Sequence, residues 1–137
     1  MTVEEILQGE SKDLEFKEKL PEDSKKYMKT IVAFSNGDGG RLIIGVNDDR
    51  EVVGVDQTAV FTMIDKITNA ISDSCEPLII PDIAPQAVGD KTVIVVEISA
   101  GRQRPYYLKS LGMDKGTFIR TSGSTRLADR PFIQEMY

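Results

Sequence analysis

Basic and aromatic residues alternate in the last third of the sequence. Five cations lie close to three aromatic rings there: Arg102, Arg104, Lys109, Arg120 and Arg126 with Tyr106, Tyr107 and Phe118. Arginine and lysine contact phosphate oxygens regardless of base sequence, and aromatic rings can stack on unpaired bases. The stretch IRTSGSTR adds the hydroxyls of Ser122 and Ser124, which also suit phosphate oxygens. This segment predicts a contact with a nucleic-acid backbone; in the alternative, Tyr106, Phe118 and Ile119 are core residues and only the flanking bases face outward.

The charge of the chain is unevenly distributed. The net charge is −5 overall, but residues 101–130 contain seven basic and two acidic residues, a net of +5. Residues 1–100 contain ten basic and nineteen acidic residues, a net of −9. Such asymmetry is typical of a protein with an anionic partner at one end, and a solvated polar tail is the alternative.

Composition limits the chemistry that the chain can perform. Its 137 residues, 40% of them apolar, suit one globular domain with a single core. The chain has no histidine, which excludes imidazole catalysis and histidine metal sites, and Cys75 alone can form no internal disulfide. No apolar run is long enough to span a membrane, and the acidic start is unlike a secretory signal. We therefore expect no membrane partner and a cytoplasmic location.

A glycine cluster, AFSNGDGGRLIIGV, suggests a nucleotide-binding loop at first sight. A phosphate-binding P-loop needs a Lys followed by Ser or Thr after its last glycine, and here Arg41 and Leu42 follow. A dinucleotide fingerprint follows a strand and opens a helix, whereas this cluster follows a predicted helix and opens a predicted strand. We expect the glycines to turn a corner, with Asn36 and a left-handed Gly37 ending the helix; a backbone anion nest is the alternative.

Hydrophobic periodicity predicts a mixed α/β (α+β) fold. Helical spacing or capping signals mark helices over residues 2–8, 25–35 and 60–71, and the opening turn of another over 131–137. Strand-like runs occupy residues 13–20, 41–46, 51–55, 82–88 and 91–99, with two shorter β-like pieces within 105–109 and 116–128. Turn residues at 47–50 and 89–90 predict hairpins. The expected architecture is a mixed, largely antiparallel sheet of hairpins with two to three packed helices.

Three blocks of sequence carry a resemblance to a known family. They are GES..LEFKEKL at the start, IVAFSNGDGGRLIIGVNDDREVVGV in the middle, and RPYYLK with GTFIRTSGSTRLA near the end. Together they resemble the Schlafen AlbA-like domain, in the same order and over about residues 2–128. That family has also been labelled a divergent AAA ATPase, and its bacterial members are called transcriptional regulators or RecG-related proteins. The ATPase label has no support in the glycine cluster.

The resemblance implies a function as well as a fold. It implies a nucleic-acid-binding domain over residues 1–128, contacting the phosphate backbone, with DNA a better candidate than RNA. Residues 129–137 would begin a helix leading to a region outside this chain, such as the winged-helix part of a bacterial transcriptional regulator. Relatives with two such lobes facing each other imply a homodimer as a further expectation. No cofactor is expected for this function.

The resemblance also implies an alternative, metal-dependent cleavage of RNA. In Schlafen relatives that cleave RNA, three carboxylates bind the metal, and the matching positions here are Glu10, Glu15 and Asp48, with Asp49 equally able to fill the last. Hard oxygen ligands suit Mg²⁺ or Mn²⁺, which can polarise a phosphate and activate water. Lys17 would stabilise charge that develops on the phosphate. Solvated carboxylates without catalytic function are the simpler interpretation, so we expect binding and not catalysis.

Overall fold

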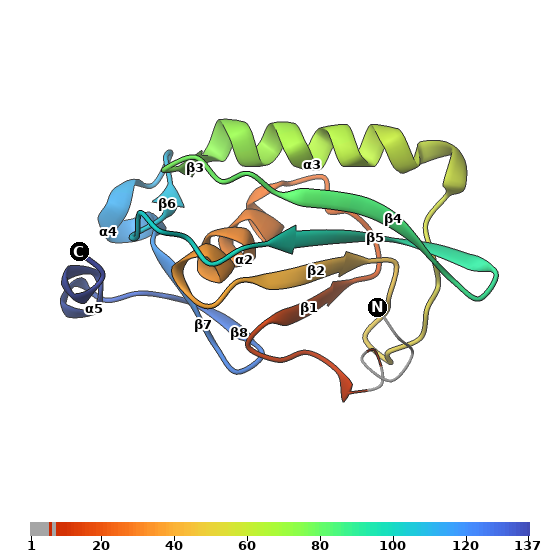
Figure 1. Ribbon diagram of the computed structural model, residues 1–137, viewed down its shortest axis with the longest axis horizontal. Coiled ribbons are helices and arrows are strands. Elements are labelled where there is room, and N and C mark those ends of the chain that lie inside the picture. The colour runs from red at the N-terminus through yellow and green to blue at the C-terminus, as the bar shows by residue number, and fades with distance from the viewer. Residues whose placement is uncertain (1–5, 7) are drawn as a thin grey trace.

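The computed structural model describes Ile6 and residues 8–137. The helix expected over residues 2–8 lies outside the described residues. The central sheet has four strands. Figure 1 shows it in the middle of the molecule, with the helix α3 (Val60–Ser74) along one side and the C-terminal elements gathered at one end. The mixed α+β class is therefore confirmed. In the part of the chain described, no helix is both long and apolar enough to cross a membrane.

The central sheet has the strand order β1-β2-β5-β4. The strand β5 is antiparallel to both of its neighbours, β2 and β4, whereas β1 and β2 are parallel because α2 crosses over between them. The sheet is therefore largely antiparallel, as predicted, with one parallel pair. The bounds of these elements are β1 (Leu14–Lys17), α2 (Lys25–Asn36), β2 (Gly40–Ile44), β4 (Asp82–Val88) and β5 (Lys91–Ile98).

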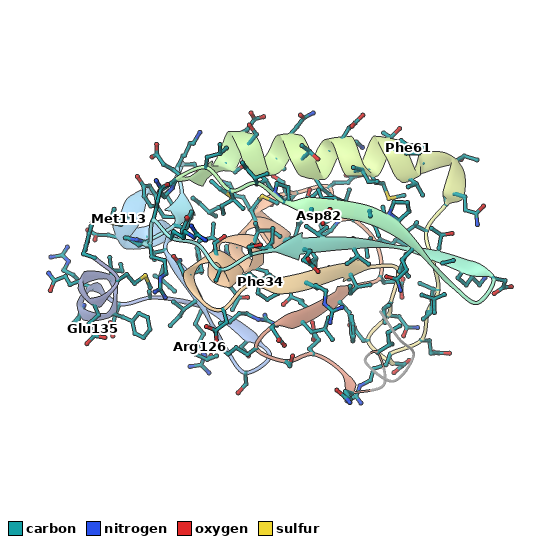
Figure 2. The ribbon with its side chains drawn as sticks, viewed as in Figure 1. Phe34, Phe61, Asp82, Met113, Arg126 and Glu135 are labelled. Atoms are coloured by element: carbon teal, nitrogen blue, oxygen red, sulfur yellow. The ribbon has the colours of Figure 1, made fainter. Side chains whose placement is uncertain are left out.

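Helices α2 and α3 (Val60–Ser74) bury their apolar sides against one face of the sheet. Their side chains recur at helical spacing, which aligns them in one stripe per helix. Phe61 has the same spacing, but it lies in the first turn of α3 and is 77% exposed (Figure 2). The main core is formed by Met28, Ile31 and Val32 of α2, Ile67 and Ile71 of α3, and Leu42, Ile44, Ile94 and Val96 of the sheet.

A smaller apolar cluster lies on the opposite face of the sheet. Leu14 and Phe16 of β1 belong to it, together with Ile43 and Val93 from the next strands. Because side chains alternate along a strand, Glu15 of β1 projects toward the face that α2 covers. This alternation separates Glu15 from its apolar neighbours and decides what its carboxylate contacts.

The glycine cluster turns the corner between α2 and β2, as predicted. The backbone N–H groups of Gly37 and Gly39 both donate to the carbonyl of Phe34. The left-handed residue is Gly39, with φ +86°, and not Gly37, whose φ is −110°. A Cβ at Gly39 would lie 2.6 Å from the carbonyl oxygen of Ile98, so the strand β5 leaves room for glycine only.

Residues 51–55 are not the second strand of a hairpin, which corrects the sequence prediction. The turn itself forms, since Asn47 Oδ1 accepts bonds from the N–H groups of Asp49 and Glu51. Beyond it Val46 and Val52 form an isolated bridge, and the N–H groups of Val53 and Gly54 both donate to the carbonyl of Gly45 instead of continuing a ladder. Both edges of β2 are already paired, with β1 and β5, so the returning chain has no edge on which to add.

The C-terminal elements pack at one end of the sheet (Figure 1). The predicted glycine-turn hairpin forms as β7 and β8, and β7 packs along α2. Asp129 caps the last helix by accepting a 2.9 Å bond from the N–H of Phe132. The remaining elements are η1 (Gln57–Ala59), β3 (Cys75–Glu76), β6 (Tyr107–Leu108), α4 (Gly112–Gly116), β7 (Phe118–Thr121), β8 (Ser124–Leu127) and α5 (Arg130–Glu135).

Candidate nucleic-acid interface

One buried side chain, Asn36 at the end of α2, fixes the basic segments in place. Its Nδ2 donates 2.9 Å bonds to the carbonyls of Tyr106 and Phe118, and its Oδ1 accepts a 2.7 Å bond from the N–H of Tyr106. The guanidinium of Arg104 donates to the Asn36 carbonyl at 3.2 Å. The segment 102–109 and the strand β7 are therefore attached to α2 at one point. The local sequence around Asn36 predicts only that it ends the helix.

Four of the predicted phosphate-binding cations are exposed. Arg102, Arg104 and Lys109 lie in the segment that follows β5, and Arg126 lies on the hairpin strand β8 at the edge of the molecule (Figure 2). Arg126 is the cross-strand partner of Ile119 in β7. These four side chains are exposed to solvent and accessible to an anionic partner.

Arg120 occupies a different position, which corrects its predicted role as a phosphate contact. It is only 6% exposed, and its Nη1 lies 2.8 Å from Oε1 of Glu15 in an ion pair. It also donates to the carbonyls of Ser11 and Leu14, at 2.8 and 3.2 Å, and its guanidinium lies over the Phe34 ring. Arg120 therefore binds groups of the protein itself and does not reach an external phosphate.

Glu15, the acidic partner in this ion pair, is also buried. Its second oxygen, Oε2, accepts a 2.8 Å bond from the hydroxyl of Thr30 on α2. That hydroxyl lies 3.0 Å from the hydroxyl of Thr125 on β8. Both carboxylate oxygens thus have partners inside the protein. Lys17, two residues further along β1, is half-buried and lies on the same face of the strand as Glu15.

The other two predicted carboxylates do come together. Glu10 and Asp48 line one pocket of about 350 Å³ with Phe16, Asn47 and Arg50. Glu10 is held there because its Oε2 accepts a 3.1 Å bond from the N–H of Phe16. The pocket has polar walls, and Arg50 supplies a cation to it.

A three-carboxylate metal site is not assembled. Glu15 faces Arg120 and α2, on the other side of β1 from the pocket that holds Glu10 and Asp48. Across Ile6 and residues 8–137, no group of three His, Cys, Asp or Glu side chains converges as metal ligands. Asp49, the alternative third ligand, does not line the pocket. The donor set therefore does not fit the metal-dependent site that the resemblance implied.

The turn of the β7–β8 hairpin lies against Glu10. A Cβ built on Gly123 would be 3.5 Å from the Cβ of Glu10. Ser122, with φ +54°, and Ser124 flank this glycine and are exposed. The hydroxyls predicted to contact phosphate therefore lie close to the acidic pocket, a proximity that no local sequence pattern predicts.

Two of the three aromatic rings predicted to stack on bases are core residues. Tyr106 and Phe118 are 5% and 8% exposed, so the core alternative holds for them. Tyr107 is half-buried, and its hydroxyl donates a 2.8 Å bond to Glu76. This bond raises the pKa of Tyr107 above its ordinary value. Base stacking therefore does not rest on Tyr106 or Phe118.

The ion pair between Lys12 and Asp38 is not predicted by any local sequence pattern. Lys12 and Asp38 lie 2.8 Å apart and join the start of the chain to the glycine corner. The hydrogen bond between them raises the pKa of Lys12 and lowers that of Asp38. Their separation of 26 positions leaves no local pattern that would have shown the pair.

Comparison with known proteins identifies a family and several similar solved structures, among them the two described next. The family described as Schlafen, AlbA_2 matches residues 10–129. The DIP2311 protein from Corynebacterium diphtheriae is similar over 91% of this chain, with a TM-score of 0.65 and 22% identity. The chain spans 23% of that protein's length. The N-terminal domain of a RecG-related protein from Nitrosomonas europaea is similar over 93% of this chain and 94% of that domain, with a TM-score of 0.61 and 22% identity. At this identity the two structures establish the fold.

Proposed function

Because the chain belongs to the Schlafen AlbA_2 family, we propose that it is a nucleic-acid-binding module that holds the phosphate backbone. DNA is the proposed partner, and a transcriptional regulator is the proposed setting. The family and the RecG-related neighbour support a nucleic-acid-related domain. The assignment to DNA and to regulation is the finer part of the proposal, and a binding titration distinguishes DNA from RNA.

One observation carries the proposal. Of the seven basic residues within 101–130, only Arg120 and Arg130 pair with a carboxylate in the described part of the chain. Cations without such partners attract phosphates and release the counterions that surround a nucleic acid. The five that remain are Arg102, Arg104, Lys109, Lys115 and Arg126.

The test is a fluorescence-anisotropy titration against a labelled DNA duplex and a labelled RNA hairpin. We expect binding to weaken between about 50 mM and about 200 mM salt. The triple variant Arg102→Gln, Arg104→Gln and Arg126→Gln removes three phosphate contacts. For duplex DNA it should reduce the slope of log Kobs against log salt by about 2.7.

The matched control changes the same amount of charge elsewhere. Lys19, Lys66 and Lys91 are exposed and lie in the acidic part of the sequence. Replacing all three by Gln should leave the salt slope unchanged. Equal affinity of wild type and the Arg102, Arg104 and Arg126 variant would refute the proposal, and stronger binding of the RNA hairpin would reassign the partner from DNA to RNA.

RNA cleavage is the second candidate, favoured by the pocket that Glu10 and Asp48 share. It is disfavoured by Glu15, whose two oxygens are taken by Arg120 and Thr30. A cleaving enzyme would need Glu15 to leave these partners, and the buried Arg120 would then lose its counter-charge. We therefore rank binding above cleavage.

A further inference from the structure

A second pocket, of about 440 Å³, lies where the start of α2 meets the end of α3 and the strand β6. It is distinct from the acidic pocket, with which it shares no residue. Three separate segments of the chain line it: Ser24, Lys25 and Met28 from α2 and its cap, Asp73 and Ser74 from α3, and Leu108, Lys109 and Ser110 after β6.

Five of the polar side chains that line this pocket are donors without internal partners in the described residues. Lys25 and Lys109 contribute ammonium groups from two different segments. Ser24, Ser74 and Ser110 contribute hydroxyls, and the side chain of Ser24 makes no capping bond to the helix that it precedes. Within the described residues, none of these five side chains has an ion pair or hydrogen bond. The pocket therefore holds two positive charges and three hydroxyls that are available to a ligand.

The frame around the pocket is fixed. Its apolar floor consists of Met28 and Leu108, which are 0% and 2% exposed. The N–H of Lys109 donates a 2.8 Å bond to the carbonyl of Ser74, which joins two of the three segments. The thiol of Cys75, the residue after Ser74, is buried, and this burial raises its pKa to about 12. The positive charge of Lys109 lowers the same pKa by a smaller amount.

We propose that this pocket binds a phosphate group, with Lys25 and Lys109 as counter-charges and the three serine hydroxyls as hydrogen-bond donors. Two ammonium groups outweigh the single carboxylate, that of Asp73, so the pocket favours an anion. The inference goes beyond the proposed function, which uses Lys109 but neither Lys25 nor the serines around the pocket. The phosphate can come from a nucleic-acid backbone or from free inorganic phosphate.

Inorganic phosphate is the first probe. A titration followed by amide chemical shifts should show saturable shifts at Ser74 and Ser110, with chloride at matched ionic strength as the reference. Lys25→Gln and Lys109→Gln should each weaken the affinity about tenfold, the loss expected for one charge-assisted hydrogen bond. Lys26→Gln is the matched control, since Lys26 is the exposed neighbour of Lys25 but does not line the pocket.

Asp73 provides a test in the opposite direction. Its carboxylate repels a phosphate, so Asp73→Asn should tighten phosphate binding about two- to fivefold. Shifts that grow linearly with phosphate, or that chloride reproduces, would overturn the proposal. So would an equal loss in the Lys25→Gln and Lys26→Gln variants.

A second arm identifies the source of the phosphate. Duplex DNA that displaces bound phosphate, and that binds Lys25→Gln more weakly than Lys26→Gln, assigns the pocket to the nucleic-acid backbone. Phosphate binding that persists beside bound DNA assigns it to free phosphate. Failure of the proposed function gives a different result. In that case the Arg102, Arg104 and Arg126 variant binds DNA as tightly as wild type does, while the pocket still binds phosphate.

Discussion

Arg120 of β7 and Glu15 of β1 form a buried ion pair, 2.8 Å between Nη1 and Oε1, across 105 positions of sequence. Arg120 also bonds to the hydroxyl of Thr125 at 3.0 Å, and Thr30 completes the partners of Glu15. The pair thus joins the hairpin, the first strand and α2. It explains why two residues that resemble functional groups in the sequence are structural in the fold.

Removing one partner of this pair should destabilise the protein strongly. Arg120→Met leaves the Glu15 carboxylate buried without a counter-charge, which costs about 3–5 kcal/mol of unfolding free energy. Arg130→Met is the matched control, since its pair with Asp114 is exposed and is worth at most about 1 kcal/mol. Urea unfolding of the two variants measures the difference. Equal losses in both would show that the buried pair contributes nothing beyond an ordinary surface contact.

The glycine corner offers a second matched comparison. Gly39→Ala must place a Cβ at φ +86° and 2.6 Å from the Ile98 carbonyl oxygen, so it combines backbone strain with a clash. Gly89→Ala has φ +62° but no atom within 4 Å of its Cβ. We expect a loss of about 1 kcal/mol for Gly89→Ala and clearly more for Gly39→Ala. Thermal unfolding that ranks the two variants in reverse order would contradict this account of the corner.

The cap of η1 makes a prediction about acid stability. Asp56 accepts bonds from the hydroxyl and the N–H of Thr58, and these bonds lower its pKa below the ordinary value of 3.8. The folded state therefore binds this proton less readily than the unfolded state. The stabilisation is complete above about pH 4 and is lost as the pH falls through the lowered pKa.

Asp56→Asn isolates this effect, because Asn also caps helices but does not titrate. Its melting temperature should fall less than that of wild type when the pH is lowered from about 6 to about 2.5. Asp90→Asn controls for the change of charge, since the described residues give Asp90 no such hydrogen bonds. Parallel acid profiles for wild type and Asp56→Asn would disprove the role of the cap.

Local patterns predicted most of the elements and the pairing within two hairpins, but not the pairing between distant segments. The helical stripe that contains Met28 and Ile31, and the hairpin around residues 89–90, depend on spacing within one segment. Residues 51–55 could form a strand only if an edge of β2 were open. One of these edges is occupied by the parallel strand β1, whose Leu14 pairs with Arg41, far from it in the sequence. Spacing within a segment carries no information on such an edge.

The candidate site could also be predicted only as far as local sequence determines it. The basic character of residues 101–130 is a property of composition and could be predicted, together with the exposure of Arg102 and Arg126. The burial of Arg120 could not, because its partner Glu15 is 105 positions away and both residues look like solvated charges in sequence. The convergence of Glu10 with Asp48, and of Lys25 with Lys109, likewise exists only after folding.

The last prediction concerns cleavage. We expect a labelled RNA hairpin to stay intact with the protein in Mn²⁺ or Mg²⁺, because Glu15, held by Arg120 and Thr30, does not join Glu10 and Asp48 as a third ligand. The assay is gel analysis of the hairpin over time, with Asp48→Asn run beside wild type. Metal-dependent cleavage that disappears in Asp48→Asn while its melting temperature is kept would establish a nuclease. It would also require the buried pair of Glu15 and Arg120 to open when RNA and metal bind. The free-energy cost of this opening would then have to agree with the stability that Arg120→Met loses in urea unfolding.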